Sequence, residues 1–281
     1  AQRTGCHFVT TVQGIHGTDF ALKRRYNAIM TRGELVITNS RFTAEHVIEM
    51  YQADPARIRI IHRGVDLDVF TPEAVSSARI IGLAERWRLP DGAPVVMLPG
   101  RLTSWKGHHL LIEAIERLGR RDICCVFVGE EKERGNYRSA LERDIERRGL
   151  GGVVRLVGGC RDMAAAYMMA DVVVSASSRP EAFGRVVAEA QAMGRPVVAA
   201  DHGGAREIVI DGETGWLFAP DDPAALAAAL GEALSLPEDP RANLAHRAMT
   251  RVREHFGLKK MCNATLSVYA EVLEGNGAGQ P

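Results

Sequence analysis

Two pairs of charged residues have the types and spacing to handle a ligand that carries a diphosphate and a diol. Glu181 and Glu189 are separated by seven residues, and Arg101 and Lys106 lie close together in another segment. Two fixed cations can neutralise a departing diphosphate without a metal ion. Glu189 lies more than one helical turn after Glu181, and its carboxylate can accept two hydrogen bonds from a vicinal diol such as ribose.

The segment around the glutamates predicts a strand, a loop, a helix and a second strand. An apolar run at 171–175 leads in, and Pro180 disfavours its continuation as a central strand. The helix is predicted over 184–193, with Gly194 as its C′ residue and Pro196 blocking its continuation. Such a unit aims unpaired backbone N–H groups at the carboxyl edge of a parallel sheet, where anions bind.

Composition places the chain among ordinary globular proteins. Its 281 residues favour two domains, and 46% apolar with 25% charged residues is a typical balance. The zero formal net charge gives no attraction to nucleic acid, and no apolar run approaches the roughly 20 residues of a membrane span. The five cysteines are odd in number and include no Cys-x-x-Cys motif, so we expect a reduced, cytosolic chain without cysteine-bound metal.

Apolar runs alternate regularly with helical segments from about residue 93 onward. This alternation predicts a parallel sheet covered on both faces. No Gly-x-Gly-x-x-Gly follows any run, so a dinucleotide fingerprint is missing. The predicted strands are 95–98, 123–128, 153–157, 172–175, 196–200 and 215–218. The predicted helices are 76–87, 107–119, 134–149, 162–169, 184–193, 204–210, 222–235, 240–254 and 258–273.

The first 75 residues predict only three strand–helix steps. A doubly wound nucleotide-binding domain usually has about six strands, so this portion corresponds to an incomplete domain. The predicted strands are 7–12, 35–38 and 58–61, with helices at 19–31 and 41–51. The expected division is a partial N-terminal domain at 1–75, a second domain at 76–256, a final helix at 257–274 and a flexible tail at 275–281.

Several phrases of the sequence resemble the retaining glycosyltransferases of family four, which have the GT-B fold. They are EAFGRVVAE, GRPVVA, RLTSWKG, VITNSRFTAEHV and IRIIHRGVDLDVFTP. The resemblance implies an α/β protein with two Rossmann-like, doubly wound parallel-sheet domains, of which the first is incomplete here. It also implies that the last helix returns to pack on the N-terminal domain, and that a nucleoside-diphosphate sugar binds between the domains.

The resemblance assigns the four charged residues of the two pairs. Arg101 and Lys106 would hold the diphosphate and stabilise its developing charge. Glu189 would hold the ribose, and Glu181 would contact the donor sugar near the reacting carbon without acting as a nucleophile. If the glutamates stood alone, the favoured interpretation would be an ordinary βαβ unit with solvated carboxylates. The cation pair and the other phrases favour the functional one.

Further donor contacts follow from the resemblance. Main-chain N–H groups around Phe183, Gly184 and Arg185 would bind phosphate oxygens. Gly129 permits a close backbone approach to a ligand. Arg161 lies in the loop that runs along the nucleobase in the family, where backbone contacts do not fix the residue type.

The loop after the first predicted strand departs from the family. The family often places a His directly before the loop glycine, where it contacts the donor sugar. Here Gln13 precedes Gly14, and His16 comes three residues after Gln13. Gln13 can hydrogen-bond a hydroxyl but cannot carry a proton. A surface location is the favoured interpretation of His16, with a donor contact as the alternative.

The resemblance implies transfer of a sugar to an acceptor hydroxyl with retention of anomeric configuration, without metal or cofactor. The acceptor would be a glycan, a lipid or a small molecule, and a bacterial envelope glycan such as lipopolysaccharide is one expectation. The protein would be cytoplasmic, with peripheral contact at the inner face of the cytoplasmic membrane left open. A solvated helix face is the favoured interpretation of the basic run Lys23, Arg24 and Arg25, with anionic lipid or a phosphorylated acceptor as the alternative.

Two other interpretations stay open. One is a nucleotide-sugar-binding module that is inactive without a further N-terminal portion, since a truncated sheet leaves an unpaired edge. The other is a different GT-B reaction, either epimerisation of a sugar nucleotide or glycogen-type phosphorolysis. The latter would need a cofactor-bearing lysine in a distinct context, which the sequence does not contain. The sequence does not determine the nucleobase, the donor sugar or the oligomeric state.

Overall fold

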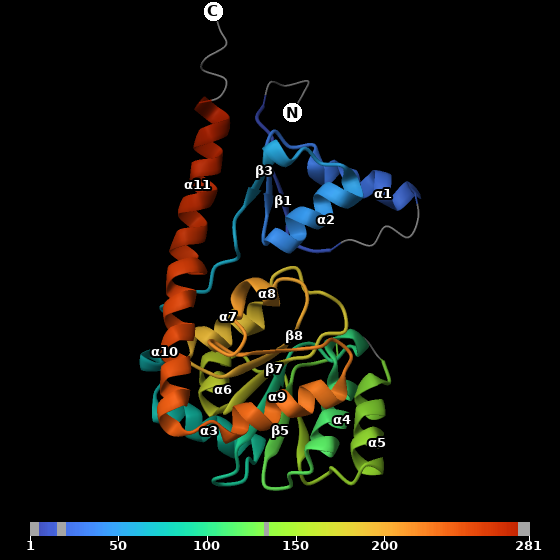
Figure 1. The fold of residues 1–281 in the computed structure, drawn as a ribbon, viewed down its shortest axis with the longest axis vertical. Helices are drawn as coiled ribbons and strands as arrows, with labels where there is room; N and C mark the ends of the chain where they lie inside the picture. Colours follow the sequence, from blue (N-terminus) through green and yellow to red (C-terminus); the bar gives the residue numbers. More distant parts are fainter. Residues whose placement is uncertain (1–5, 16–20, 132–134, 275–281) are drawn as a thin grey trace, which may run out of the picture. The chain divides into compact units, whose positions relative to one another are not determined.

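The computed structural model describes residues 6–15, 21–131 and 135–274, and its strands and helices are shown in Figure 1. Contacts divide the chain into two compact units. The first unit contains Ala1–Gly64, Glu181–Phe183 and His255–Pro281, and the second contains Val65–Pro180 and Gly184–Glu254.

The division after Gly64 precedes the predicted boundary at residue 75. Val65 is buried, and Phe70 packs on Tyr167 of the second unit with ring centroids 6.1 Å apart. The intervening segment therefore belongs to the second unit by its packing. The predicted tail at 275–281 lies outside the described residues.

The second unit contains a sheet of six strands among its described residues, all parallel, in the order β6-β5-β4-β7-β8-β9. From β4 the chain builds outward through β5 and β6. It then returns to the other side of β4 to build β7, β8 and β9. The strands are β4 Val95–Pro99, β5 Cys124–Val128, β6 Val154–Gly158, β7 Val172–Ser175, β8 Val197–Ala200 and β9 Trp216–Phe218.

The central strands are apolar along their whole length. All five residues of β4 and all five of β5 are buried, which is expected when helices cover both faces of a parallel sheet. The helices are α3 Ser77–Trp87, α4 His108–Leu118, α5 Tyr137–Arg147, α6 Met163–Met169, α7 Arg185–Ala192, α8 Ala205–Ile208, α9 Pro223–Ser235 and α10 Glu238–His255. Short 3-10 turns cover Ala28–Thr31, Pro55–Arg57, Pro72–Ala74 and Ser104–Lys106.

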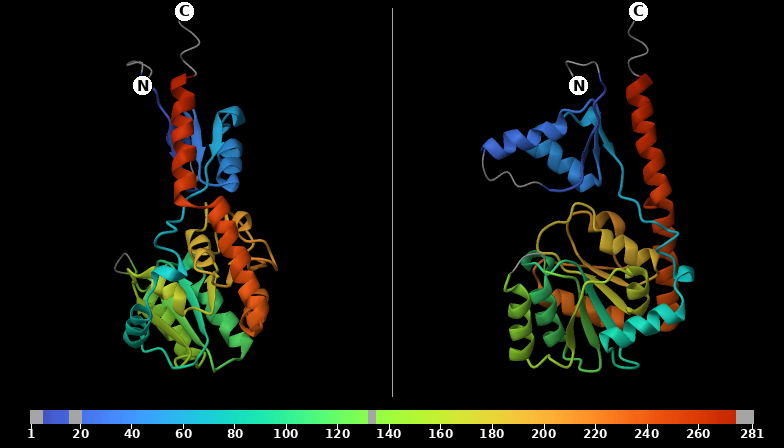
Figure 2. Two further views of the ribbon diagram at one scale, coloured as in Figure 1. Left: turned by 90° about the vertical axis from the view of Figure 1, so that its left-hand side faces the viewer. Right: turned by 180° about the vertical axis from the view of Figure 1, so that it is seen from behind.

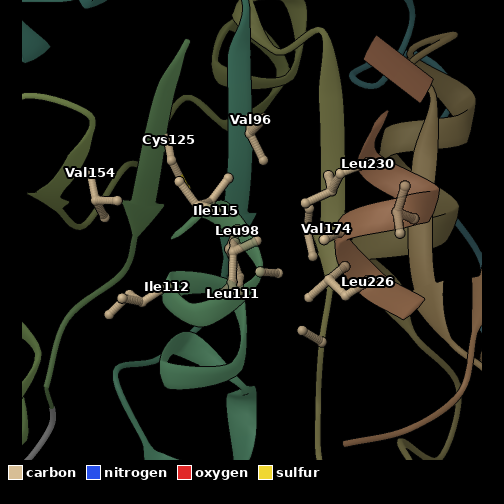
Figure 3. Packing of buried hydrophobic residues seen from close by; sticks show 14 of the residues in the cluster. Val96, Leu98, Leu111, Ile112, Ile115, Cys125, Val154, Val174, Leu226 and Leu230 are labelled. Carbon is tan, nitrogen blue, oxygen red and sulfur yellow. The ribbon is translucent and has the colours of Figure 1, made fainter. Parts of the chain in front are cut away.

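One large hydrophobic cluster joins this sheet to the helices α4 and α9 (Figure 3). On α4, Leu111 and Ile115 are four positions apart, so they lie on the same face of the helix and pack toward the strands. Each fully buried side chain of this size contributes about 1.5–3 kcal/mol relative to exposure. The labelled members are Val96, Leu98, Leu111, Ile112, Ile115, Cys125, Val154, Val174, Leu226 and Leu230.

The first unit has a three-stranded parallel sheet in its described residues, in the order β1-β2-β3. Successive residues of β2 face opposite sides, and each side has its own small cluster. Val36 packs with Val12 and Val47 of α2, whereas Ile37 packs with Ile61 and Val268 of α11. Figure 2 shows α2 and α11 on opposite faces of this sheet. The elements are β1 Thr10–Val12, α1 Ala21–Asn27, β2 Val36–Thr38, α2 Arg41–Tyr51, β3 Ile58–Ile60 and α11 Leu258–Glu274.

The predicted α/β architecture with two parallel sheets is confirmed, including the shorter first sheet. The helix predicted at 41–51 is α2 with the same bounds, because the Ser40 side chain accepts a hydrogen bond from the Thr43 N–H at 2.9 Å and fixes its start. The helix predicted at 19–31 differs, since α1 ends at Asn27 and a 3-10 turn continues to Thr31. Such tightening is frequent at helix C-termini.

Candidate functional site

The charged residues identified in the sequence follow strands that adjoin in the second sheet. Val96 of β4 is in register with Val172 of β7, and the chain changes its direction of sheet building between these strands. In open parallel sheets the carboxyl ends of two such strands form the usual ligand site. Arg101 and Lys106 follow β4, and the loop after β7 leads through Glu181 to α7.

Main-chain contacts hold the loop after β4 in place. The Gly100 N–H donates to the Val128 carbonyl at 2.9 Å, and the Leu102 N–H donates to the Glu130 carbonyl at 3.1 Å. On the other side, the Ser178 N–H donates to the Trp105 carbonyl at 2.8 Å. The cation-bearing loop is therefore joined to the loops after β5 and β7.

Gly107 brings this loop back to the sheet. Its φ of +78° is in the left-handed region, and an added Cβ would lie 1.8 Å from the Ala176 carbonyl oxygen. Only glycine accommodates both conditions. The sequence Lys106-Gly107 therefore anchors the end of the loop directly before α4.

The two predicted cations have different surroundings. Arg101 is exposed, whereas Lys106 is half-buried and its Nζ lies 4.4 Å from the ring centroid of Trp105. This is a cation–π arrangement between the ammonium and the indole ring. The structure thus places one guanidinium group and one ammonium group on a loop whose backbone is held by hydrogen bonds.

The helix α7 begins at a glycine without a side-chain cap. Gly184 is buried with φ +101° and, as the N-cap residue of α7, provides no side-chain cap hydrogen bond. The first N–H groups of α7 lack partners within the helix and carry its positive dipole end. The N-terminus of α7 can therefore accept an anionic group, as the sequence predicts for the backbone at Phe183, Gly184 and Arg185.

Glu181 and Phe183 pack with the first unit. The Phe183 side chain is buried, with ring centroids 6.2 Å from His62 and 5.8 Å from Phe256. The Ala182 carbonyl accepts from the Thr43 hydroxyl at 3.3 Å. The side chain of Phe183 thus serves packing and leaves only its main chain for a ligand, whereas Glu181 is half-buried.

Glu189 is nearly enclosed and already hydrogen-bonded. Its Oε1 accepts from Arg185 Nη2 at 2.7 Å and Nε at 3.1 Å, and its Oε2 accepts from the Tyr167 hydroxyl at 3.0 Å. Tyr167 is fully buried, and burial, followed by the neighbouring Glu189 charge, raises the pKa of its hydroxyl well above the ordinary value. The carboxylate predicted to hold a diol therefore has one buried and one surface partner.

Gly129 and Arg161 follow β5 and β6. An added Cβ at Gly129 would lie 1.8 Å from the Gly100 carbonyl oxygen, and the Gly129 N–H donates to the Gly158 carbonyl at 2.8 Å. The close backbone approach expected at Gly129 is thus made to a neighbouring loop. Arg161 is exposed beyond β6.

The loop after β1 lies in the first unit. The Gln13 side-chain oxygen accepts from Arg63 Nη1 at 2.8 Å, and the Gln13 carbonyl accepts from Asn39 Nδ2 at 3.1 Å. Gly14 follows in a half-buried position. His16 lies outside the described residues, so its predicted donor contact stays a prediction.

The basic run on α1 is partly engaged in the fold. Lys23, Arg24 and Arg25 are all exposed, and Arg24 Nε also donates to the Met50 carbonyl at 2.7 Å. Leu22 and Tyr26 are also exposed on this helix. The basic run is therefore a solvated helix face, in which Arg24 also makes one hydrogen bond within the fold.

No group of three or more His, Cys, Asp or Glu side chains in the described part of the chain is arranged to hold a metal ion. Among the helices of residues 6–15, 21–131 and 135–274, none is long and apolar enough to cross a bilayer.

Sequence reasoning missed two side chains at the carboxyl edge of the second sheet. Tyr167 lies in the run MAAAYMMA, where nothing in the spacing points to Glu189. His202, after β8, has Nε2 2.8 Å from the Ser177 carbonyl. Because a carbonyl only accepts, that nitrogen carries the proton. A polar aromatic within an otherwise small, apolar helix is the only available signal for Tyr167.

Comparisons with known proteins show the family and the fold class of the chain. Residues 83–254 match the family model of the glycosyl transferases group 1, and residues 3–69 match that of glycosyltransferase family 4. The fold is that of the GT-B class of α/β proteins, with two Rossmann-like units that each contain a parallel sheet. The chain belongs to the glycosyl transferases group 1.

Individual relatives include proteins of known structure. A glycosyltransferase from Rickettsia africae is 33% identical with a TM-score of 0.90, over 97% of this chain and 72% of that one. The Anabaena protein HepE in complex with UDP and glucose is 26% identical with a TM-score of 0.85, over 93% of this chain and 71% of that one.

A curated relative is the D-inositol 3-phosphate glycosyltransferase of Xylanimonas cellulosilytica. It is 37% identical over 88% of this chain and 59% of its own length. A second protein with the same name, from a Nocardioides species, is 33% identical over 88% of this chain and 56% of its own length. The chain thus spans somewhat more than half the length of these relatives.

Proposed function

We propose that the protein transfers a sugar from a nucleoside-diphosphate sugar to an acceptor hydroxyl, with retention of anomeric configuration. The observation that carries the proposal is the arrangement at the switch point of the second sheet. A fixed loop with two cations follows β4, and an uncapped helix N-terminus follows its neighbour β7. Both groups of donors suit a diphosphate, which is the leaving group of such a transfer.

Each site residue has a role in this proposal. Arg101 and Lys106 bind the diphosphate and stabilise the negative charge that develops as the bond to the sugar breaks. The N–H groups of Gly184 and Arg185 at the start of α7 act with them. Since a pre-aimed donor is worth about 3 kcal/mol in a transition state, these groups can supply much of the catalysis without a metal or cofactor.

The glutamates act on the uncharged parts of the donor. Glu189 accepts hydrogen bonds from the ribose hydroxyls, and Glu181 contacts the donor sugar near the reacting carbon. The acceptor hydroxyl attacks from the face that the diphosphate leaves. Attack on that same face retains the configuration at the carbon, and the departing phosphate oxygen takes the proton of the hydroxyl.

The nature of the donor and the acceptor is supported by relatives. The HepE structures contain UDP, glucose or UDP-glucose, which favours a nucleoside-diphosphate hexose as donor. The curated relatives are named for D-inositol 3-phosphate, which makes a phosphorylated polyol one acceptor to test. A lipid-linked envelope glycan is the other, since exposed Lys23 and Arg25 can attract an anionic acceptor or membrane surface.

A titration tests the donor site first. The 281-residue protein is titrated with UDP, GDP and ADP while its melting temperature is followed. A ligand at a hundred times its Kd adds about 2.7 kcal/mol of apparent stability. We expect one of the three nucleotides to raise the melting temperature. If none does, the proposed donor site is wrong.

A transfer assay then tests the reaction. The preferred nucleotide is supplied as its hexose conjugate together with D-inositol 3-phosphate or a lipid-linked glycan. The product's anomeric configuration, read by NMR, decides between retention and inversion. Nucleotide binding without transfer to either acceptor would favour the second candidate, a binding module. One observation favours that module. Arg101, Lys106 and Glu189 all lie in the second unit, so this unit alone carries these donor-binding residues.

Lys106→Ala is the sharpest single change for this reaction. We expect turnover to fall about a hundredfold, because the diphosphate loses a preorganised cation as its charge develops. Lys259→Ala, on the exposed surface of α11, is the matched control and should retain full turnover. Unchanged turnover in Lys106→Ala would remove this residue from the proposed mechanism.

A further inference from the structure

The two oxygens of the Glu189 carboxylate have partners of different kinds. Oε2 accepts one hydrogen bond, from the Tyr167 hydroxyl at 3.0 Å. Oε1 accepts two, from Arg185 Nη2 at 2.7 Å and Nε at 3.1 Å. A carboxylate offers about four acceptor positions, so a diol that needs two of them must replace at least part of this set.

The Tyr167 partner is fixed. The side chain is 0% exposed, and its ring packs against Phe70. It lies on α6, whose first turn is capped by Asp162, and Asp162 in turn pairs with Arg79 at 2.7 Å. Moving this hydroxyl would require the buried helix to repack, so it stays on Oε2 when a ligand binds.

The Arg185 partner is exchangeable. Its side chain is 62% exposed, whereas the Glu189 side chain is only 10% exposed. The guanidinium end of this i,i+4 pair stands in water, which can replace it as a partner of Oε1. The guanidinium can therefore rotate into solvent, and Oε1 is the oxygen that becomes available.

We infer that Tyr167 is a positioning residue that holds Glu189 for the donor's ribose diol, and that Arg185 is a built-in competitor for the same carboxylate. This inference rests on the proposed function, since it takes Glu189 as the ribose ligand. Tyr167 holds Oε2 so that Oε1 faces the ligand. The diol binds by displacing Arg185 from Oε1.

The inference predicts how the protein distinguishes nucleotides. A 2′-deoxynucleotide keeps only the 3′-hydroxyl of the diol, so it can donate one hydrogen bond to a correctly oriented Glu189 instead of two. We therefore expect the protein to bind a ribonucleoside diphosphate about tenfold more tightly than its 2′-deoxy counterpart. This preference should depend on Tyr167, because it reports the orientation of the carboxylate.

The first experiment compares wild type with Tyr167→Phe, using UDP, GDP and ADP and their 2′-deoxy forms in calorimetric titrations. Phe retains the ring packing and removes only the hydroxyl. We expect the variant to lose most of the tenfold ribose preference, because its affinity for the ribonucleotide falls much more than its affinity for the 2′-deoxy form. The matched control is Tyr137→Phe, a hydroxyl of the same unit 3.5 Å from His108 Nδ1, and it should keep the preference. An unchanged ribose preference in Tyr167→Phe overturns the inference.

The second experiment uses Arg185→Leu and does not depend on the folding of the Tyr167 variant. Removing the competitor should tighten ribonucleotide binding about twofold and 2′-deoxynucleotide binding by less. Arg138→Leu removes a similar pair, with Glu142 four positions on, and should change neither affinity. If Arg185→Leu weakens both forms equally, Arg185 binds the diphosphate and does not compete.

The outcomes separate the inference from the proposed function. Absence of binding of every nucleotide to wild type overturns the donor site and, with it, the inference. Binding with a ribose preference that survives in Tyr167→Phe overturns the inference alone. Loss of the preference in Glu189→Gln together with its survival in Tyr167→Phe would assign the diol to Glu189 without any role for Tyr167.

Discussion

The carboxyl edges of the two sheets are held by different kinds of contact. At the edge of the second sheet, main-chain N–H groups donate to main-chain carbonyls of neighbouring loops, as at Gly100, Leu102 and Ser178. At the edge of the first sheet, side chains make the contacts. The Thr43 hydroxyl donates to Asn39 Oδ1 at 2.8 Å, and Asn39 Nδ2 donates to the Gln13 carbonyl.

This difference assigns the polar side chains to different tasks. Where the main chain holds the loops, their placement does not depend on contacts of side chains such as Arg101 and Lys106, and glycine is needed where backbones approach closely. Where side chains hold the loops, Asn39, Ser40 and Thr43 are buried and used for structure. Substitutions should therefore affect the two edges through different mechanisms.

Gly107→Ala should produce the largest effect. The added Cβ would lie 1.8 Å from the Ala176 carbonyl oxygen, and φ +78° is strained for alanine. Strain of this backbone conformation and overpacking together cost about 3–5 kcal/mol. We expect a corresponding fall in the free energy of unfolding, measured by denaturant titration, and weakened nucleotide binding as the loop separates from β7.

The control for this change is Gly119→Ala. Gly119 also has a left-handed φ, of +69°, but nothing lies within 4 Å of an added Cβ. Its cost should therefore be only the backbone strain of about 1–2 kcal/mol. Equal effects of the two substitutions would show that close main-chain approach does not hold this edge.

The fold could be predicted from the sequence to a large extent because its signals are local. Apolar runs such as 124–128 are buried along their length, and α4 and α9 have regular apolar faces. The alternation of these elements fixes a parallel sheet, and the cap at Ser40 fixes the start of α2. These features depend on residues close together in the chain.

The site could be predicted only in part because its remaining contacts are not local. Tyr167 and Glu189 are 22 positions apart on different helices, and no periodic pattern connects them. The Phe183 ring is buried against His62 and Phe256, so its position in the motif reflects packing. Glycines such as Gly129 meet other loops, and a sequence does not reveal which backbone a glycine approaches.

A buried histidine should make the stability of the second unit depend on pH. His108 is fully buried at the start of α4, and burial lowers its pKa from 6.5 to about 4. The folded protein keeps the imidazole neutral, whereas the unfolded chain takes up a proton below pH 6.5. The stability is therefore complete above about pH 6.5 and is lost as the pH falls toward 4, by up to roughly 3 kcal/mol.

The measurement is the free energy of unfolding between pH 4 and pH 7 for wild type and for His108→Leu. The difference between the two proteins should vary with pH by the amount given above, because leucine does not titrate. The buried side chains Asn39, Ser40 and Thr43 of the first sheet edge carry no titratable group. A pH-independent difference would mean that His108 is protonated or hydrated in the folded protein, contrary to its burial.

Asn39→Ala should produce the smallest of these effects. The substitution removes the donor to the Gln13 carbonyl and the acceptor for the Thr43 hydroxyl, so each of these groups loses its hydrogen bond to Asn39. The expected cost is about 1–3 kcal/mol in the free energy of unfolding, since buried polar groups lose their hydrogen bonds. Asn136→Ala is the control, because Asn136 is exposed and makes no cap hydrogen bond at α5, and its cost should be below about 0.5 kcal/mol. If Asn39→Ala instead costs more than Gly107→Ala, the side-chain contacts hold the edge of the first sheet more strongly than the main-chain contacts hold the edge of the second.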